Sequence, residues 1–94
     1  MDCGGFRFSR HAIERMFQRG IADTVEGIVR GGEVIASYPD DTPLLSMLIL
    51  GFDQGQPVHV VAARNAASRL CHVITVDRPD RAVRSDDFRT RSQP

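Results

Sequence analysis

Hydrophobic residues in the first part of the chain recur at helical spacing. Ile13, Met16 and Phe17 lie three and four residues apart, the spacing of a buried stripe along one side of a helix. Ser9 is a favourable N-cap before this stripe, and Gly20 is a favourable stop after it. The pattern therefore predicts a helix that is capped by Ser9 and ends at Gly20.

A second short helix is predicted over residues 23–30. Asp23 and Glu26 have the spacing of a capping box, and the Gly31-Gly32 pair ends the helical pattern. Its apolar side consists of Val25, Ile28 and Val29.

Beyond residue 32 the period of the pattern changes from helical to strand-like. Runs rich in Val, Ile, Leu and Tyr alternate with turn signals, and the connections are short enough for antiparallel hairpins. The run 44–52 is apolar at nearly every position, so we expect it to be covered on both faces or to lie in a dimer interface. The predicted fold class is α+β, with two N-terminal helices followed by a four-stranded antiparallel sheet. Its strands are 33–38, 44–52, 58–63 and 70–77.

The length of 94 residues fits one compact domain. We expect a single α+β domain over residues 1–80 and an Arg-rich C-terminal extension over residues 81–94. Hydrophobic residues make up 41% of the chain, which is ordinary for a globular protein. No apolar run approaches the ~20 residues of a membrane span, so we expect a soluble, cytoplasmic protein with no membrane partner.

The charged residues are balanced in number but not in position. Residues 1–19 hold four Arg and two acids (net +2), residues 20–63 one Arg and six acids (net −5), and residues 64–94 seven Arg and four acids (net +3). If the two ends of the chain meet, a basic patch suited to a polyanion would result. All twelve basic residues are Arg, which suits phosphate recognition but equally suits a GC-rich genome.

Metal and thiol chemistry have little support in the sequence. Cys3 and Cys71 are too few and too far apart for a metal knuckle or a disulfide framework, so we expect free thiols. Cys71 and His72 are adjacent in a predicted strand and so point to opposite faces. We therefore expect no metal site and no cofactor.

One side of the first predicted helix carries a polar row of His11, Arg15 and Arg19, spaced four residues apart. His11 lies in the first turn, where the helix dipole disfavours a positive charge, and a neutral imidazole can accept a proton. A proton acceptor beside fixed positive charge is what cleavage of an RNA phosphodiester needs. The alternative is a solvated helix face with an incidental His.

His59 stands in the otherwise apolar run 58–63 and must find a polar partner. The functional interpretation places this strand beneath the first helix, with His59 near the row defined by His11. The alternative is a core or interface histidine that is hydrogen-bonded within the fold. Candidate substrate-binding residues on and after the neighbouring strands are Thr75, Arg64 and Arg78.

An ordered set of motifs resembles a small bacterial family known as domain of unknown function 4258. The motifs are Ser9-x-His11-Ala12-x-x-Arg15-Met16-x-x-Arg19-Gly20-Ile21, Gly32-Glu33-Val34-Ile35-x-x-Tyr38-Pro39-Asp40, Leu50-Gly51, Gly55-x-Pro57-Val58-His59-Val60-Val61 and Val73-Ile74-Thr75-Val76. The resemblance covers residues 9–80. It implies a fold like the RelE-type ribonuclease toxins, and it carries over His11, Arg15, Arg19, His59 and Thr75 as recurring polar residues.

The resemblance and the polar row together lead to one functional hypothesis. The chain is expected to be a metal-independent endoribonuclease of toxin type that cuts mRNA, on the ribosome in many such toxins, and is inhibited by a partner antitoxin. His11, Arg15 and His59 are its expected catalytic residues, with Arg19 beside them on the phosphate. The alternative is a non-catalytic homodimeric module that binds RNA or protein, because a fold alone does not decide activity.

Overall fold

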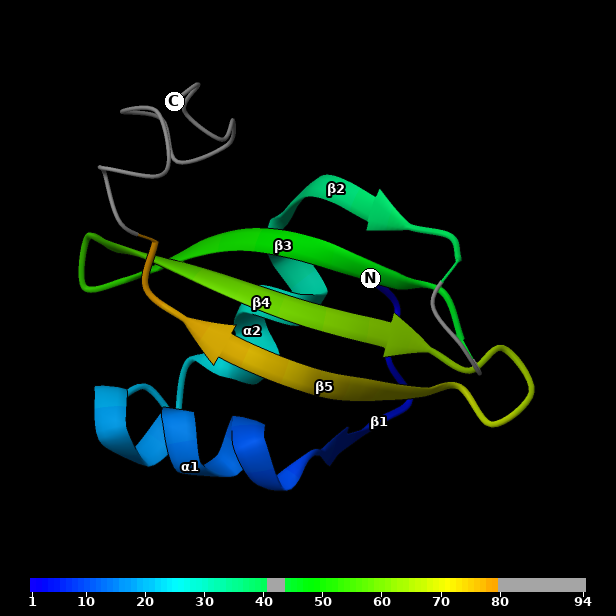
Figure 1. The fold of residues 1–94 in the computed structure, drawn as a ribbon, viewed down its shortest axis with the longest axis horizontal. Coiled ribbons are helices and arrows are strands. Elements are labelled where there is room, and N and C mark those ends of the chain that lie inside the picture. Colours follow the sequence, from blue (N-terminus) through cyan, green and yellow to red (C-terminus); the bar gives the residue numbers. More distant parts are fainter. Residues whose placement is uncertain (41–43, 80–94) are drawn as a thin grey trace.

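The computed structural model describes residues 1–40 and 44–79 of the 94-residue chain. The expected extension over residues 81–94 therefore lies outside the described residues. Within the described residues, two helices and five strands follow one another, and the strands form one sheet in the order β1-β5-β4-β3-β2 (Figure 1). The elements are β1 (Gly5–Phe8), α1 (Arg10–Arg19), α2 (Val25–Gly31), β2 (Glu33–Tyr38), β3 (Ser46–Asp53), β4 (Gln56–Arg64) and β5 (Leu70–Asp77).

The predicted fold class is wrong at its N-terminal end. A strand, β1, precedes the helices and pairs in parallel with β5, so the sheet is five-stranded and mixed, and both helices lie between strands. The pairing runs from Gly5 opposite Leu70 to Phe8 opposite Val73. The segment Gly5–Phe8 has only four residues and begins with glycine, so its hydrophobic pattern is too short to predict a strand. They become a strand because a partner 65 positions later in the chain supplies their hydrogen bonds.

The two ends of α1 are where the sequence places them. The Ser9 hydroxyl oxygen accepts a hydrogen bond from the Ala12 N–H at 2.9 Å and donates one to the Ile74 carbonyl oxygen at 2.6 Å. Gly20 has a left-handed conformation with φ of 66°, which a glycine adopts at little cost. Ser9 therefore caps α1 and also holds the start of this helix against β5.

The side of α1 that is buried differs from the predicted stripe. Ala12 and Met16 are buried, whereas Ile13 is 42% exposed and Phe17 is 78% exposed. The predicted stripe was therefore wrong for two of its three residues. The reason is that α1 lies beside β5 at the border of the sheet, as Figure 1 shows. Only a narrow side of the helix therefore contacts the sheet.

The start of α2 also differs from the prediction. The helix begins at Val25, and its N-cap residue Thr24 makes no side-chain capping hydrogen bond. The Thr24 hydroxyl instead donates to Asp53 Oδ1 at 2.7 Å. The capping-box interpretation of Asp23 and Glu26 was therefore wrong, because the N-cap residue is Thr24, whose side chain bonds to Asp53 at the end of β3 and does not cap the helix.

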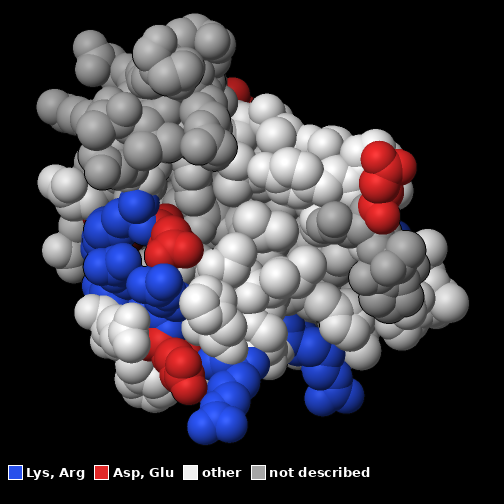
Figure 2. Space-filling view, viewed as in Figure 1, with Lys and Arg blue, Asp and Glu red and all other residues white. Residues whose placement is uncertain are grey.

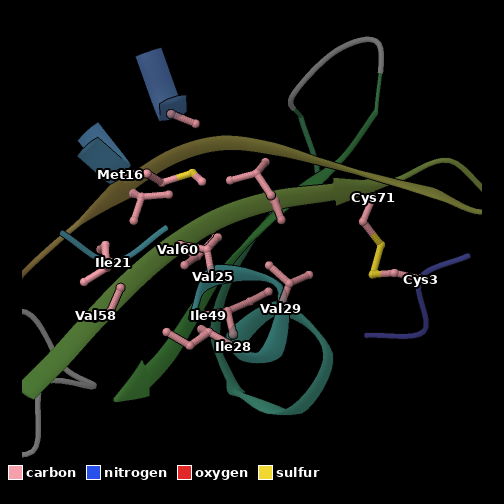
Figure 3. Close-up of a cluster of buried hydrophobic side chains, with 14 residues drawn as sticks. Cys3, Met16, Ile21, Val25, Ile28, Val29, Ile49, Val58, Val60 and Cys71 are labelled. Atoms are coloured by element: carbon pink, nitrogen blue, oxygen red, sulfur yellow. A yellow bond between two sulfur atoms is a disulfide. The ribbon is translucent and has the colours of Figure 1, made fainter. Parts of the chain in front are cut away.

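The main hydrophobic core lies between α2 and one face of the sheet. Figure 3 shows the side chains of α2 against those of β3 and β4. The packing at Gly51 is close, since a Cβ there would lie 2.5 Å from the Ile28 side chain. The buried residues at the centre of this core include Val25, Ile28, Val29, Ile49, Val58 and Val60.

The apolar run predicted over residues 44–52 forms β3, which lies between β2 and β4. Leu48, Ile49 and Leu50 are all buried within a single chain. Since successive side chains of a strand point to opposite faces, β3 is covered on both faces. A dimer interface is therefore not needed to explain its apolar sequence, and the expected homodimer stays a prediction.

Cys3 and Cys71 form a disulfide, so the expectation of free thiols was wrong. Their Cα atoms lie 5.6 Å apart, although the residues are 68 positions apart in the sequence. The parallel pairing of β1 with β5 brings them together, with Phe6 opposite Cys71 in the register.

Among the described residues, no helix is long and apolar enough to cross a membrane.

Candidate functional site

Two residues of the polar row of α1, His11 and Arg15, line a shallow pocket on the surface of the molecule. Four residues of this helix surround a volume of about 260 Å³: His11, Glu14, Arg15 and Gln18. Helical spacing places His11 one turn before Arg15 and close to Glu14, whose Oε1 accepts a hydrogen bond from Arg10 Nε at 3.3 Å. An imidazole, a carboxylate and a guanidinium therefore line one solvent-open depression, which we call the α1 pocket.

Asp77 at the end of β5 holds the two arginines of the row. Its Oδ1 atom lies 3.6 Å from Arg15 Nη1 and 3.7 Å from Arg19 Nη2. Its other oxygen, Oδ2, accepts a hydrogen bond from the Thr75 hydroxyl at 3.2 Å. Figure 2 shows basic side chains gathered around acidic ones at this end of the molecule.

These ion pairs orient the guanidinium groups more than they stabilise the fold. Arg15, Arg19 and Asp77 are each at least one third exposed, and ion pairs in water contribute about 0–1 kcal/mol. Part of each guanidinium stays accessible to an anion from solution. Sequence analysis did not predict Asp77 as a site residue. The pattern that could have indicated it is its spacing of two residues from Thr75, which puts both side chains on one face of β5.

His59 lies near this cluster in the sheet but not in the α1 pocket. It is the register partner of Asp77 in the antiparallel pair of β4 and β5, so the two side chains share a face. His59 is only 8% exposed, however, and is not among the residues that line the pocket. The expected passage of its strand beneath the first helix does not occur, because β5 lies between β4 and β1 in the sheet and α1 packs against β5.

The three remaining predicted residues are in different places. Thr75 belongs to the Asp77 cluster, as described above. Arg78 comes directly after Asp77 in the sequence, and its Nη2 atom lies 3.5 Å from Asp53 Oδ2. Arg64 is remote, because it is the last residue of β4, where its Nε donates to the backbone oxygen of Asp2 at 2.6 Å.

Residues 1–40 and 44–79 contain no group of three or more His, Cys, Asp and Glu side chains arranged to hold a metal ion. The chemistry that the α1 pocket can offer from its own side chains is proton transfer and charge stabilisation. An imidazole and a carboxylate can exchange protons with a bound group, and the guanidinium groups can bind an anion.

Comparison with known proteins matches the chain to a family. A family model described as a domain of unknown function (DUF4258) matches residues 8–78, which include both helices and the strands β2 to β5. Searches of the curated proteins and of the solved structures gave no significant match. All residues of the α1 pocket and Asp77 lie inside the matched segment.

Proposed function

The chain belongs to the DUF4258 family, whose description gives no activity, and we propose that it is an endoribonuclease that cleaves RNA at the α1 pocket. The observation that carries the proposal is that His11, Glu14 and Arg15 line one open pocket. Arg19, which Asp77 holds beside Arg15, extends the positive charge. Proton-transfer groups beside fixed positive charge match the needs of phosphodiester cleavage.

The proposed reaction is an internal transfer at phosphorus that needs no metal. A base in the pocket takes the proton of the ribose 2′-hydroxyl, and the 2′-oxygen attacks the adjacent phosphorus. The bond to the 5′-oxygen breaks, and an acid in the pocket gives that oxygen a proton. The products are a 2′,3′-cyclic phosphate and a 5′-hydroxyl end. His11 and Glu14 are the proton-transfer pair in this scheme.

Arg15 and Arg19 hold the phosphate in the same scheme. A guanidinium offers several N–H donors in a plane, so Arg15 can keep its contact with Asp77 and still donate to a phosphate oxygen. The negative charge that grows on the phosphate oxygens during attack is then next to two positive groups. His59 was expected to act directly, but its burial favours a role inside the sheet rather than contact with substrate.

The toxin hypothesis extends this proposal to partners. An mRNA-cleaving protein in a cytoplasm would require a partner that keeps it inactive, and covering the α1 pocket would be sufficient. The solvent-open position of the pocket supports this extension, because a partner protein can reach it. RNA is thus the proposed substrate, and an antitoxin protein is the proposed inhibitor.

Binding of RNA without cleavage is the second candidate. It is favoured by the burial of His59, which takes one of the two expected proton-transfer groups away from the site. The arginines of α1 would bind the phosphate backbone in either case. The two candidates therefore differ in whether bound RNA is cut.

The experiment that separates them uses purified protein and an end-labelled RNA in buffer with EDTA. Cleavage that leaves 2′,3′-cyclic phosphate ends, and that a 2′-deoxy substitution at the cut site prevents, would support the ribonuclease. Binding in a filter assay without cleavage would support the second candidate. Intact RNA and no binding would exclude both.

A further inference from the structure

Two arginines at the end of the sheet away from Asp77 converge on one carboxylate oxygen. Arg64 is the last residue of β4, and Arg69 directly precedes β5. Asp2 Oδ2 lies 3.8 Å from Arg64 Nη2 and 3.3 Å from Arg69 Nη2. The backbone oxygen of Asp2 also accepts a hydrogen bond from Arg64 Nε at 2.6 Å. We call this pair of guanidinium groups the Arg64–Arg69 site.

The turn between β4 and β5 positions the backbone of the Arg64–Arg69 site. Asn65 Oδ1 accepts hydrogen bonds from the N–H groups of Ala67 at 2.9 Å and Ser68 at 3.2 Å. The Arg69 N–H donates to the Asn65 backbone oxygen at 2.7 Å. These contacts lie within the turn and do not involve Asp2. The backbone that carries the two arginines therefore has its own support when Asp2 is absent.

The group that occupies the Arg64–Arg69 site resembles a phosphate chemically. A carboxylate and a phosphate both present oxygens that share negative charge, and a guanidinium donates several N–H groups in a plane to either. A phosphate has more acceptor oxygens than a carboxylate, so it can accept from both guanidinium groups at once. The two arginine side chains are 29% and 62% exposed, and an anion from solution can reach them. Asp2 is thus an internal competitor for such an anion.

The disulfide between Cys3 and Cys71 keeps this competitor in place. Cys71 is the register partner of Arg64 in the antiparallel pair of β4 and β5, so the two share a face. Figure 3 shows the disulfide joining the N-terminal segment to β5. The Asp2 side chain is 74% exposed, and exposed ion pairs are weak by themselves. The covalent link next to Asp2 is therefore the main restraint on its position.

A dithiol can break this restraint. An open depression of about 500 Å³, lined by Met1, Asp2, Cys3 and Arg30, gives a small dithiol a route to Cys3. One thiolate of the dithiol attacks a sulfur of the disulfide, and its second thiol then closes the mixed disulfide. The protein S–S bond breaks, two electrons and two protons pass to Cys3 and Cys71, and the dithiol becomes a cyclic disulfide. Residues 1–3 then keep noncovalent contacts alone.

We propose that the Arg64–Arg69 site binds a phosphate group when Asp2 leaves it, and that reduction of the disulfide lets Asp2 leave. The phosphate group is either free or part of the backbone of a nucleic acid, since the same donors bind both. The site lies at the start of β5, whereas Asp77 lies at its end, so it is separate from the α1 pocket. The proposal does not depend on cleavage of RNA at that pocket.

The test follows the Nε–Hε signals of Arg64 and Arg69 by NMR in the full 94-residue protein labelled with nitrogen-15. Inorganic phosphate and the oligonucleotide hexauridylate are titrated separately at constant ionic strength, with and without dithiothreitol. We expect reduction to tighten binding at these two signals by about threefold or more, the effect of losing an exposed competing charge. A gain with phosphate identifies a free phosphate as sufficient, and a gain with hexauridylate alone identifies the nucleic-acid backbone.

Three results of this titration would overturn the proposal. The first is equal affinity before and after reduction. The second is a set of shifts confined to α1 with either probe. The third is loss of the folded spectrum on reduction, because the open site requires a folded reduced protein.

Asp2→Asn tests the Arg64–Arg69 site without breaking the disulfide. It keeps the size of the side chain but removes the competing charge, so the oxidised variant should bind the probes more tightly than the oxidised wild type. Asp23→Asn is the matched control, because it changes the net charge equally at an exposed carboxylate that makes neither of the two ion pairs. Equal affinity in the two variants would refute the proposal.

Cys3→Ser/Cys71→Ser tests the role of the disulfide without reductant. The folded variant should bind the probes as tightly as the reduced wild type, and dithiothreitol should not change its affinity. Binding as weak as that of the oxidised wild type would mean that the disulfide does not control the Arg64–Arg69 site.

Discussion

Arg15 of α1 and Asp77 of β5 form an ion pair, with 3.6 Å between Arg15 Nη1 and Asp77 Oδ1, although 62 positions separate them in the chain. The same carboxylate oxygen lies 3.7 Å from Arg19. Asp77 therefore determines where the positive charge of α1 is held. It also offsets that charge, which makes it the residue whose removal best tests an anion site.

Removing the Asp77 charge should strengthen RNA binding. Asp77→Asn keeps the size of the side chain but frees Arg15 and Arg19 from a competing anion. We expect a severalfold gain in affinity and a steeper decrease of affinity with added salt, since counterion release follows the number of phosphate contacts. Filter binding at 50 and 200 mM salt measures both. If Asp77→Asn bound RNA more weakly at an unchanged thermal midpoint, the orientation that Asp77 gives to Arg15 and Arg19 would matter more for RNA binding than the negative charge that it adds.

The proton-transfer role of the α1 pocket predicts a large loss of cleavage. His11→Ala and Glu14→Gln should each lower the rate about 10²- to 10⁴-fold, the range of a lost general acid or base. Binding of RNA should change much less. Arg7→Ala is the control, because Arg7 is exposed on β1 and does not line the pocket. Cleavage that survives in both pocket variants would rule out this site.

Expression in a bacterial host tests the toxin hypothesis directly. Induction of the wild-type chain without a partner should arrest growth and produce discrete cuts in mRNA, which primer extension can map. The arrest and the cuts should disappear in His11→Ala and Arg15→Ala. Normal growth with intact mRNA after induction of a soluble wild-type chain would count against the toxin.

The disulfide should contribute to stability through the length of the loop that it closes. Cys3 and Cys71 are 68 positions apart, and closing a loop of that length restricts the unfolded chain by about 4 kcal/mol. Reductant should therefore lower the thermal midpoint of the wild type clearly. The Cys3→Ser/Cys71→Ser variant should already be less stable and should not respond to reductant. An unchanged midpoint in the reduced wild type would contradict this expectation.

Two glycines in the same region should respond in opposite ways to an added methyl group. Gly51→Ala would place a Cβ 2.5 Å from the Ile28 side chain, and overpacking of this kind costs about 1–3 kcal/mol. Gly27→Ala meets nothing within 4 Å in α2, where alanine is favoured by about 1 kcal/mol. Urea unfolding of both variants measures the difference. Destabilisation by Gly27→Ala would mean that its surroundings differ from those described.

Burial of His59 predicts that its substitution affects folding before it affects chemistry. His59→Ala removes a polar side chain that is 92% covered, and losing a buried polar partner costs about 1–3 kcal/mol. The thermal midpoint should decrease, while the cleavage rate per folded molecule should stay within a few fold of wild type. If His59→Ala lost as much cleavage rate as His11→Ala while keeping the thermal midpoint of the wild type, His59 would have to be counted among the catalytic residues.

Local patterns in the sequence were sufficient for most of the secondary structure. Ser9 and Gly20 mark the ends of α1 because a cap and a left-handed glycine act on their own few neighbours. The strands β2 and β5 have the predicted bounds, since β-branched and apolar runs between turns are also local signals. The polar row of His11, Arg15 and Arg19 follows from helical spacing alone.

What the chain could not reveal locally was decided by contacts of β1 and α1 with β5, which lies far from them in the sequence. Pairing of β1 with β5 makes the sheet mixed, brings Cys3 to Cys71, and places α1 where Arg15 meets Asp77. Periodicity indicates which side of a strand or helix a residue occupies, but not what covers that side. His59 is buried and Phe17 exposed for this reason, because burial depends on neighbours that only the folded chain supplies.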